Sequence, residues 1–246
     1  MRRFPLALTF GVLLATSACQ PSAPEAPTET LDASETAPTP ELSPEQANAL
    51  AFRAAWDSAA PATASDPNPE SEVPGSFEFT DSTVQPLGAG LYALISTGVG
   101  DNGAGAVAIH YLVRTPDGFR RNEVEPLFIS AGSGGEPQWT LRSDLTPVPA
   151  VLVSARSTGQ GRTCQIGSLV ELTPSHPVLR ADEMRLRVSD ADGAESAALE
   201  GQLAPGRVGG NFTLTFSGAS DAVVTYVLTD LGTYRPMGEP NSLPGC

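Results

Sequence analysis

The serine best placed by its neighbours for nucleophilic catalysis is Ser133, in the string AGSGG at 131–135. This string approximates the G-x-S-x-G pattern of a nucleophile elbow, and Asp144 and His176 follow it in the order serine, acid, histidine. A nucleophile elbow passes from a strand directly into a helix, whereas Pro137 interrupts any helix that would follow Ser133. We therefore expect a flexible surface turn here and assign no catalytic residue, with a serine-based hydrolase as the alternative.

Few other residues have the types and spacing of a metal or phosphate site. The two histidines, His110 and His176, form no H-x-x-x-H pair, and no two cysteines have zinc-ligand spacing. His110 lies within AVAIHYLV, where alternation places it on the polar face of a strand. Asp190, Asp192 and Glu195 lack the spacing of an EF-hand loop, so we expect a solvated hairpin there. The sequence therefore predicts no metal and no cofactor.

The charged residues exclude further classes of function. All 14 basic residues are arginine, which rules out a Schiff-base lysine, a P-loop lysine and an S-x-x-K nucleophile pair. The net charge of the whole chain is −14 at pH 7. A body this acidic repels the phosphates of nucleic acids, so we expect no nucleic-acid partner. An electrostatic partner would be cationic.

Residues 1–18 have the three-part order of a bacterial secretory signal. Arg2 and Arg3 precede a mostly apolar run over 6–15, and the small residues Thr16, Ser17 and Ala18 follow. Ten residues at 1.5 Å each cover only ~15 Å of a hydrocarbon core roughly 30 Å thick, so a permanent transmembrane helix is disfavoured. We expect cleavage after Ala18.

The segment LLATSAC, which ends at Cys19, resembles the lipobox of bacterial lipoproteins. Lipoboxes usually have leucine three residues before the cysteine, and this chain has Thr16 there. The resemblance implies that Cys19 is the lipidated first residue of the mature protein. In two-membrane bacteria an aspartate after the cysteine favours inner-membrane retention, so Gln20 implies an outer-membrane anchor facing the periplasm. The alternative is a soluble periplasmic protein whose cysteine falls there by chance.

The region after the cysteine predicts a tether, a helix and a linker. Residues 19–42 hold five prolines and only acidic charges, so they form an extended tether that reaches from ~30 Å as a coil to ~70 Å as polyproline II. Ser43-Pro44-Glu45-Gln46 predicts a capped helix start, and the helical segment 43–60 packs Phe52 and Trp56 on the body. Pro61 ends the helix, and residues 61–76 form a second linker.

Residues 77–246 have the composition of a β-rich domain. Short runs rich in β-branched and aromatic residues are separated by glycine and proline, and Pro-Asp-Gly at 116–118 predicts a hairpin. Two segments, beginning near 92 and 150, share the order strand, glycine-rich loop, strand, Thr-Pro at a spacing of 58 residues. We expect a mainly β chain, an antiparallel β-sandwich or open barrel with one short N-terminal helix.

Lipidation of Cys19 would leave two cysteines, Cys164 and Cys246. An even remainder in an exported protein predicts a disulfide, because the bacterial envelope is oxidising. The alternative is a buried Cys164 and a free terminal thiol. For the β-rich domain the sequence predicts a binding or scaffolding module of the cell envelope, with an envelope protein or a cationic ligand as partner. An envelope hydrolase with a serine-based site is the alternative.

Overall fold

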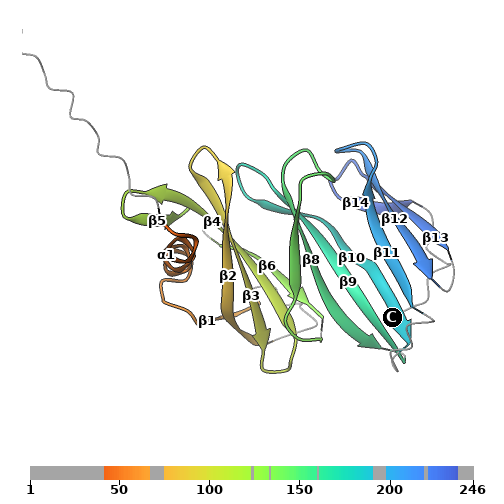
Figure 1. Cartoon of the computed structure of the whole chain (residues 1–246), viewed down its shortest axis with the longest axis horizontal. Helices are drawn as coiled ribbons and strands as arrows, with labels where there is room; N and C mark the ends of the chain where they lie inside the picture. The colour runs from red at the N-terminus through yellow and green to blue at the C-terminus, as the bar shows by residue number, and fades with distance from the viewer. Residues whose placement is uncertain are drawn as a thin grey trace, which may run out of the picture. The chain divides into compact units, whose positions relative to one another are not determined.

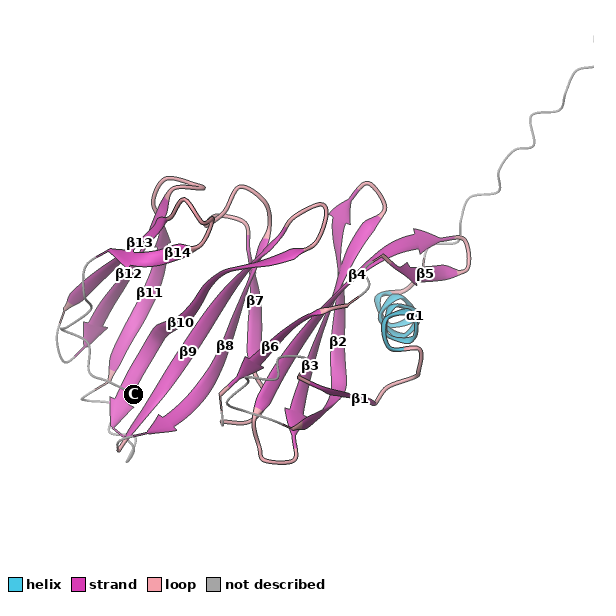
Figure 2. Ribbon diagram, turned by 180° about the vertical axis from the view of Figure 1, so that it is seen from behind, coloured by secondary structure: helices cyan, strands magenta, loops and turns pink. Residues whose placement is uncertain are grey.

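A computed structural model describes residues 42–66, 75–122, 125–132, 134–159, 161–190, 198–218 and 221–237. The predicted signal segment, Cys19, the tether up to residue 41, Ser133 and Cys246 lie outside these ranges. The described elements, labelled in Figure 1 apart from β7, which Figure 2 labels, are α1 (Pro44–Trp56), β1 (Ala62–Ser65), β2 (Ser76–Gly88), β3 (Leu91–Gly100), β4 (Gly105–Thr115), β5 (Gly118–Arg121), β6 (Leu127–Ala131), β7 (Gln138–Arg142), β8 (Ala150–Gly159), β9 (Arg162–Leu172), β10 (Pro177–Asp190), β11 (Leu199–Pro205), β12 (Asn211–Gly218), β13 (Ala222–Leu228) and β14 (Tyr234–Met237).

The strands form two antiparallel sheets, as Figure 2 shows. The first sheet has the order β1-β2-β3-β4-β5, with β6 also paired to β4. The second sheet has eight strands in the order β14-β13-β12-β11-β10-β9-β8-β7, and one of the two sheets is curled into a half-barrel. The predicted class, a mainly β antiparallel fold with one short N-terminal helix, is confirmed.

Helix α1 begins where the capping residues predict. The Ser43 hydroxyl accepts a hydrogen bond from the Gln46 amide, and the Gln46 side chain accepts one from the Ser43 amide. The helix ends at Trp56, earlier than the Pro61 boundary, because Asp57 adopts a left-handed conformation with φ of 54° that closes the last turn. Strand β1 lies within the segment 61–76, expected to be a linker, where it pairs with β2.

One face of the first sheet packs against α1. The Trp56 ring stacks on Phe79 at 4.7 Å between ring centroids and meets the His110 ring edge-on at 4.6 Å. The Trp56 indole N–H donates to the Ser96 hydroxyl over 3.3 Å. Phe52 is buried in the same cluster, which confirms that α1 packs on the body. His110 is only 1% exposed, so its expected place on a polar face is wrong, because α1 covers that face.

The other face of the first sheet packs against β8 and β9. The apolar cluster between the sheets consists mainly of β3, β4, β8 and β9 residues: Ala93, Ile95, Val107, Ile109, Tyr111, Val151, Val153, Val170 and Leu172. The two segments of the weak repeat therefore contribute facing hairpins, β3–β4 and β8–β9. Their registers differ by one residue. Ile95 pairs with Ile109, whereas Val153 pairs with Ser168 and not with Gly167, the repeat equivalent of Ile109.

The second sheet also encloses a core of its own. Side chains of β9 and β10, including Leu169, Met184 and Leu186, form one cluster with Phe212 and Leu214 of β12. Strands on both sides of β11 thus bury apolar side chains against each other, which fits the curl of a half-barrel.

Candidate functional site

The second sheet carries a polar groove that lies mainly between β7 and β11. The groove comprises two hollows of about 620 and 350 Å³. Four residues line both hollows and so join them: Gln138, Ser154, Gln165 and Arg187. These residues come from four successive strands, β7, β8, β9 and β10. Convergent polar side chains in a concave site fix the orientation of a ligand, so this groove is the candidate binding site.

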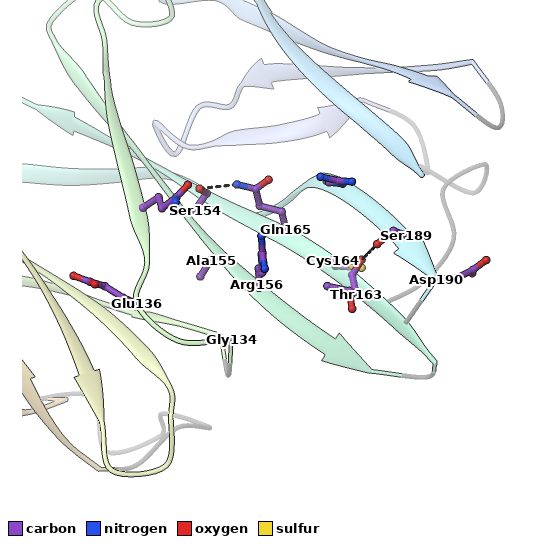
Figure 3. A pocket seen from close by; sticks show the side chains of 12 residues that line it. Gly134, Glu136, Ser154, Ala155, Arg156, Thr163, Cys164, Gln165, Ser189 and Asp190 are labelled. Atoms are coloured by element: carbon purple, nitrogen blue, oxygen red, sulfur yellow. Dashed lines mark hydrogen bonds between the residues drawn. The ribbon is translucent and has the colours of Figure 1, made fainter. Parts of the chain in front are cut away.

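The alternation of β8 explains why this part of the sheet is polar. Val151 and Val153 face the core between the sheets, so Leu152 and Ser154 face the groove. The Gln165 amide Nε2 donates to the Ser154 hydroxyl over 2.9 Å, as the dashed line in Figure 3 shows. Arg156 continues the groove face of β8 beyond Ser154. The groove face of β8 thus changes from apolar to polar along the strand.

The charges that line the groove are balanced, unlike those of the whole chain. Arg187 Nη1 lies 3.4 Å from Glu200 Oε1, and both side chains are solvent-accessible, with exposed fractions of 39% and 63%. Glu136 accepts a hydrogen bond from the Thr97 hydroxyl over 2.7 Å. Arg156 and Asp190 lie along the larger hollow. The groove therefore offers charged side chains of both signs, and it has no excess of acidic groups that would select a cationic ligand.

Arg142 connects the two sides of the groove. Its Nε and Nη2 atoms donate to the two carboxylate oxygens of Asp144, each over 2.8 Å, and Nη2 also reaches the Leu203 carbonyl of β11 over 3.3 Å. The hydrogen bond from Arg142 lowers the pKa of the Asp144 carboxyl below its ordinary value. Asp144 therefore holds the guanidinium in place and stays ionised at neutral pH.

The residues of the hydrolase alternative are distributed along the sheet. Asp144 is bound to Arg142, which pairs with Ala150 at the start of β8. Ser133 itself lies outside the described residues, but Cβ atoms built on its neighbours Gly132 and Gly134 would lie 2.5 and 2.6 Å from the Arg156 carbonyl oxygen. The six residue-to-residue steps from Ala150 to Arg156 span ~20 Å of strand. The neighbours of Ser133 and the Asp144 carboxylate thus lie near opposite ends of this stretch.

His176 belongs to the exposed connection between β9 and β10. Its Nδ1 atom lies 2.9 Å from the Ser175 hydroxyl, and its carbonyl oxygen accepts from the Thr173 hydroxyl over 2.6 Å. Thr173 follows Leu172, and Glu171 pairs with Ala150, so His176 is also near the Ala150 end of β8. This placement gives no support to a triad that includes Ser133.

Cys164 is fully buried on β9, where it pairs with Val188 of β10. It also lies along the larger hollow of the groove. Cys246 is outside the described residues, so its disulfide with Cys164 stays a prediction.

The described ranges contain no group of three or more histidine, cysteine, aspartate or glutamate side chains that could hold a metal ion. Within the same ranges, no helix is both long and apolar enough to cross a membrane.

Sequence reasoning missed the groove residues because no short motif carries them. Ser154, Gln165 and Arg187 lie on separate strands and meet only when the sheet forms. The one signal was the run Leu152, Ser154, Arg156, in which alternate residues become polar while the intervening residues stay apolar.

Comparison with known proteins found no match for this chain among family models, curated proteins or solved structures. Its function must therefore be argued from its own residues.

Proposed function

We propose that this chain is a lipid-anchored binding module of the bacterial cell envelope, held at the outer membrane and facing the periplasm. Its ligand site is the groove lined by Gln138, Ser154, Gln165 and Arg187. The observation that carries the binding role is that these side chains, from four strands, converge on one open hollow.

The anchor rests on the sequence. The lipobox-like segment ends at Cys19, and lipid attached there would hold the protein because each buried CH₂ contributes ~0.8 kcal/mol. The acidic, proline-rich tether over 19–42 would let the body reach ~30 to ~70 Å from the membrane. Removing residues 1–18 takes away two arginines and no acid, so the mature charge becomes −16. A body of this charge is repelled by anionic head groups, which favours a partner in the periplasm.

The groove supports binding over scaffolding alone. Its floor has paired donors and acceptors, such as the Gln165 amide on the Ser154 hydroxyl, that hold side chains in fixed orientations. Pre-oriented polar groups lower the entropy cost of binding a ligand. The described contacts supply no assembled nucleophile and base, so binding is the function that the geometry favours.

The binding role is tested by filling the groove. We expect Ser154→Arg to abolish capture of the partner from detergent-solubilised envelopes, because a long cationic side chain would occupy the space above Gln165. Thr215→Arg is the matched control, since Thr215 is exposed on β12, is absent from the groove lining and gains the same charge. Quantitative mass spectrometry compares the captured proteins. Equal capture by both variants would contradict a ligand site in the groove.

A further inference from the structure

Strands β7 and β11 border the groove on opposite sides, and the strand directions would allow one antiparallel strand between them. Every pairing from β7 through β8, β9 and β10 to β11 is antiparallel, so the five strands alternate in direction. Because five is an odd number, β7 and β11 run in the same direction. Direct pairing of β7 with β11 would therefore be parallel, in a sheet whose described pairs are all antiparallel. One added strand that runs opposite to both would keep the alternation.

Among the described residues, both edges of this gap are open over several positions. Among the described strands, β7 pairs only with β8. Within the described ranges, strand β11 pairs with β10 only at Glu200 and Leu199, and residues 201–205 pair with β12 alone. The same hollow of about 350 Å³ is lined by both strands: by residues 138–140 and 142 of β7 and by residues 200, 201 and 203 of β11. Open strand edges that face a shared groove are templates for a further strand.

The backbone of β11 presents hydrogen-bonding groups to this gap. The Gly206 amide donates to the Asn211 carbonyl on β12, so by alternation the N–H and C=O groups of Leu203 point away from β12. The Leu203 carbonyl agrees with this direction, because it accepts from Arg142 of β7 over 3.3 Å. A guanidinium thus crosses the gap where paired strands, ~4.8 Å apart, would be joined by backbone hydrogen bonds.

We propose that an extended peptide segment of a partner protein inserts between β7 and β11, antiparallel to both, and completes a six-stranded antiparallel barrel. This inference rests on the proposed binding function and names the class of its ligand. The five residues of β7 span ~17 Å, so about five residues of the segment would pair. Backbone hydrogen bonds on both sides supply affinity, and Ser154, Gln165 and Arg187 select polar side chains on the inward face. Proline within the segment is disfavoured because it lacks the amide donor.

The test uses the mature chain and a displayed library of 12-residue peptides. We expect selected peptides to slow amide hydrogen exchange at 138–142 and 201–204 about tenfold or more, with no change at the edge strand β14. N-methylation of either alternate set of peptide amides should weaken binding about tenfold or more, because one set donates to β7 and the other to β11, while the side chains stay intact. A nitroxide at the peptide N-terminus should broaden the NMR signals of Arg142 more than those of Gln138, because the segment runs antiparallel to β7.

Several results would overturn strand insertion. These are failure to select any peptide, protection of a different edge, a nitroxide effect strongest at Gln138, or binding that is indifferent to N-methylation. Protection of both edges in the chain alone, lost when residues 20–42 are removed, would assign the gap to the chain's own tether and overturn a partner segment. If Ser154→Arg still abolishes partner capture while the edges stay unprotected, strand insertion fails and the binding module stands.

Discussion

Replacing Glu171 by glutamine should destabilise the second sheet well beyond the effect of an ordinary surface change. Glu171 is 6% exposed and accepts from Arg180 Nε over 2.6 Å. Arg180 Nη1 donates in turn to the Gly232 carbonyl over 2.8 Å, so the pair joins β9, β10 and the connection between β13 and β14. Glutamine keeps the size of the side chain and removes its charge, so the Arg180 guanidinium loses the carboxylate with which it pairs.

The magnitude follows from the burial of the two partners. Breaking a fully buried ion pair costs about 3–5 kcal/mol, and losing a hydrogen bond to a charged group costs about 1.5–3 kcal/mol. The Arg180 side chain is 25% exposed and keeps its bond to Gly232, so the lower range applies. We expect Glu171→Gln to lower the free energy of unfolding by about 2–3 kcal/mol. For a domain of this size, the melting temperature then falls by about 4–12 °C.

Urea unfolding of the mature chain, followed by tryptophan fluorescence, measures this change. Glu200→Gln is the matched control, because Glu200 forms an exposed pair with Arg187 over 3.4 Å in the same sheet. The control should change stability by only about 0.5 kcal/mol. Equal effects of the two substitutions, or no effect of Glu171→Gln, would refute the role assigned to the buried pair.

Three further predictions concern pH and the helix. The pKa of Asp144 is lowered in the folded chain, so its carboxyl group stabilises the fold only while it is ionised. The difference in unfolding free energy between the natural chain and Asp144→Asn, measured by urea titration, should therefore be constant near neutral pH and shrink as the pH falls below 3.8. Burial raises the pKa of Tyr111, so stability should fall as pH rises above 10, where the unfolded chain ionises, and Tyr111→Phe should flatten that decline. Trp56→Phe should cost about 1 kcal/mol by chemical denaturation, since it loses the bond to Ser96, and no loss would contradict this packing.

Local patterns in the sequence were enough to predict the start of the helix and the hairpin between β4 and β5. The capping residues Ser43 and Gln46 form the predicted hydrogen bonds at the start of α1. Pro-Asp-Gly at 116–118 forms the predicted hairpin between β4 and β5. Both features depend on residues within a few positions of each other, whose backbone preferences act locally. The end of α1 was less predictable, because the left-handed conformation of Asp57 terminates it before Pro61.

The groove depends on relations that no local pattern contains. The one-residue difference in register between the hairpins β3–β4 and β8–β9 changes which side chains of β9 face the core, although their sequences resemble each other. The prediction that His110 lies on a polar face was wrong for a similar reason, because α1, which is distant in sequence, covers that face of its strand. The gap between β7 and β11 follows from strand count and order, which emerge only from the assembled sheet.

The mass of the mature N-terminus tests the central claim, a lipid-anchored envelope module, most directly. Top-down mass spectrometry of the protein purified from membranes should show a chain that begins at Cys19 and carries diacylglycerol on sulfur and an acyl chain on the amino group. Cys19→Ser should leave the protein unlipidated. An unmodified Cys19, or a mature chain that begins at another residue, would contradict the account.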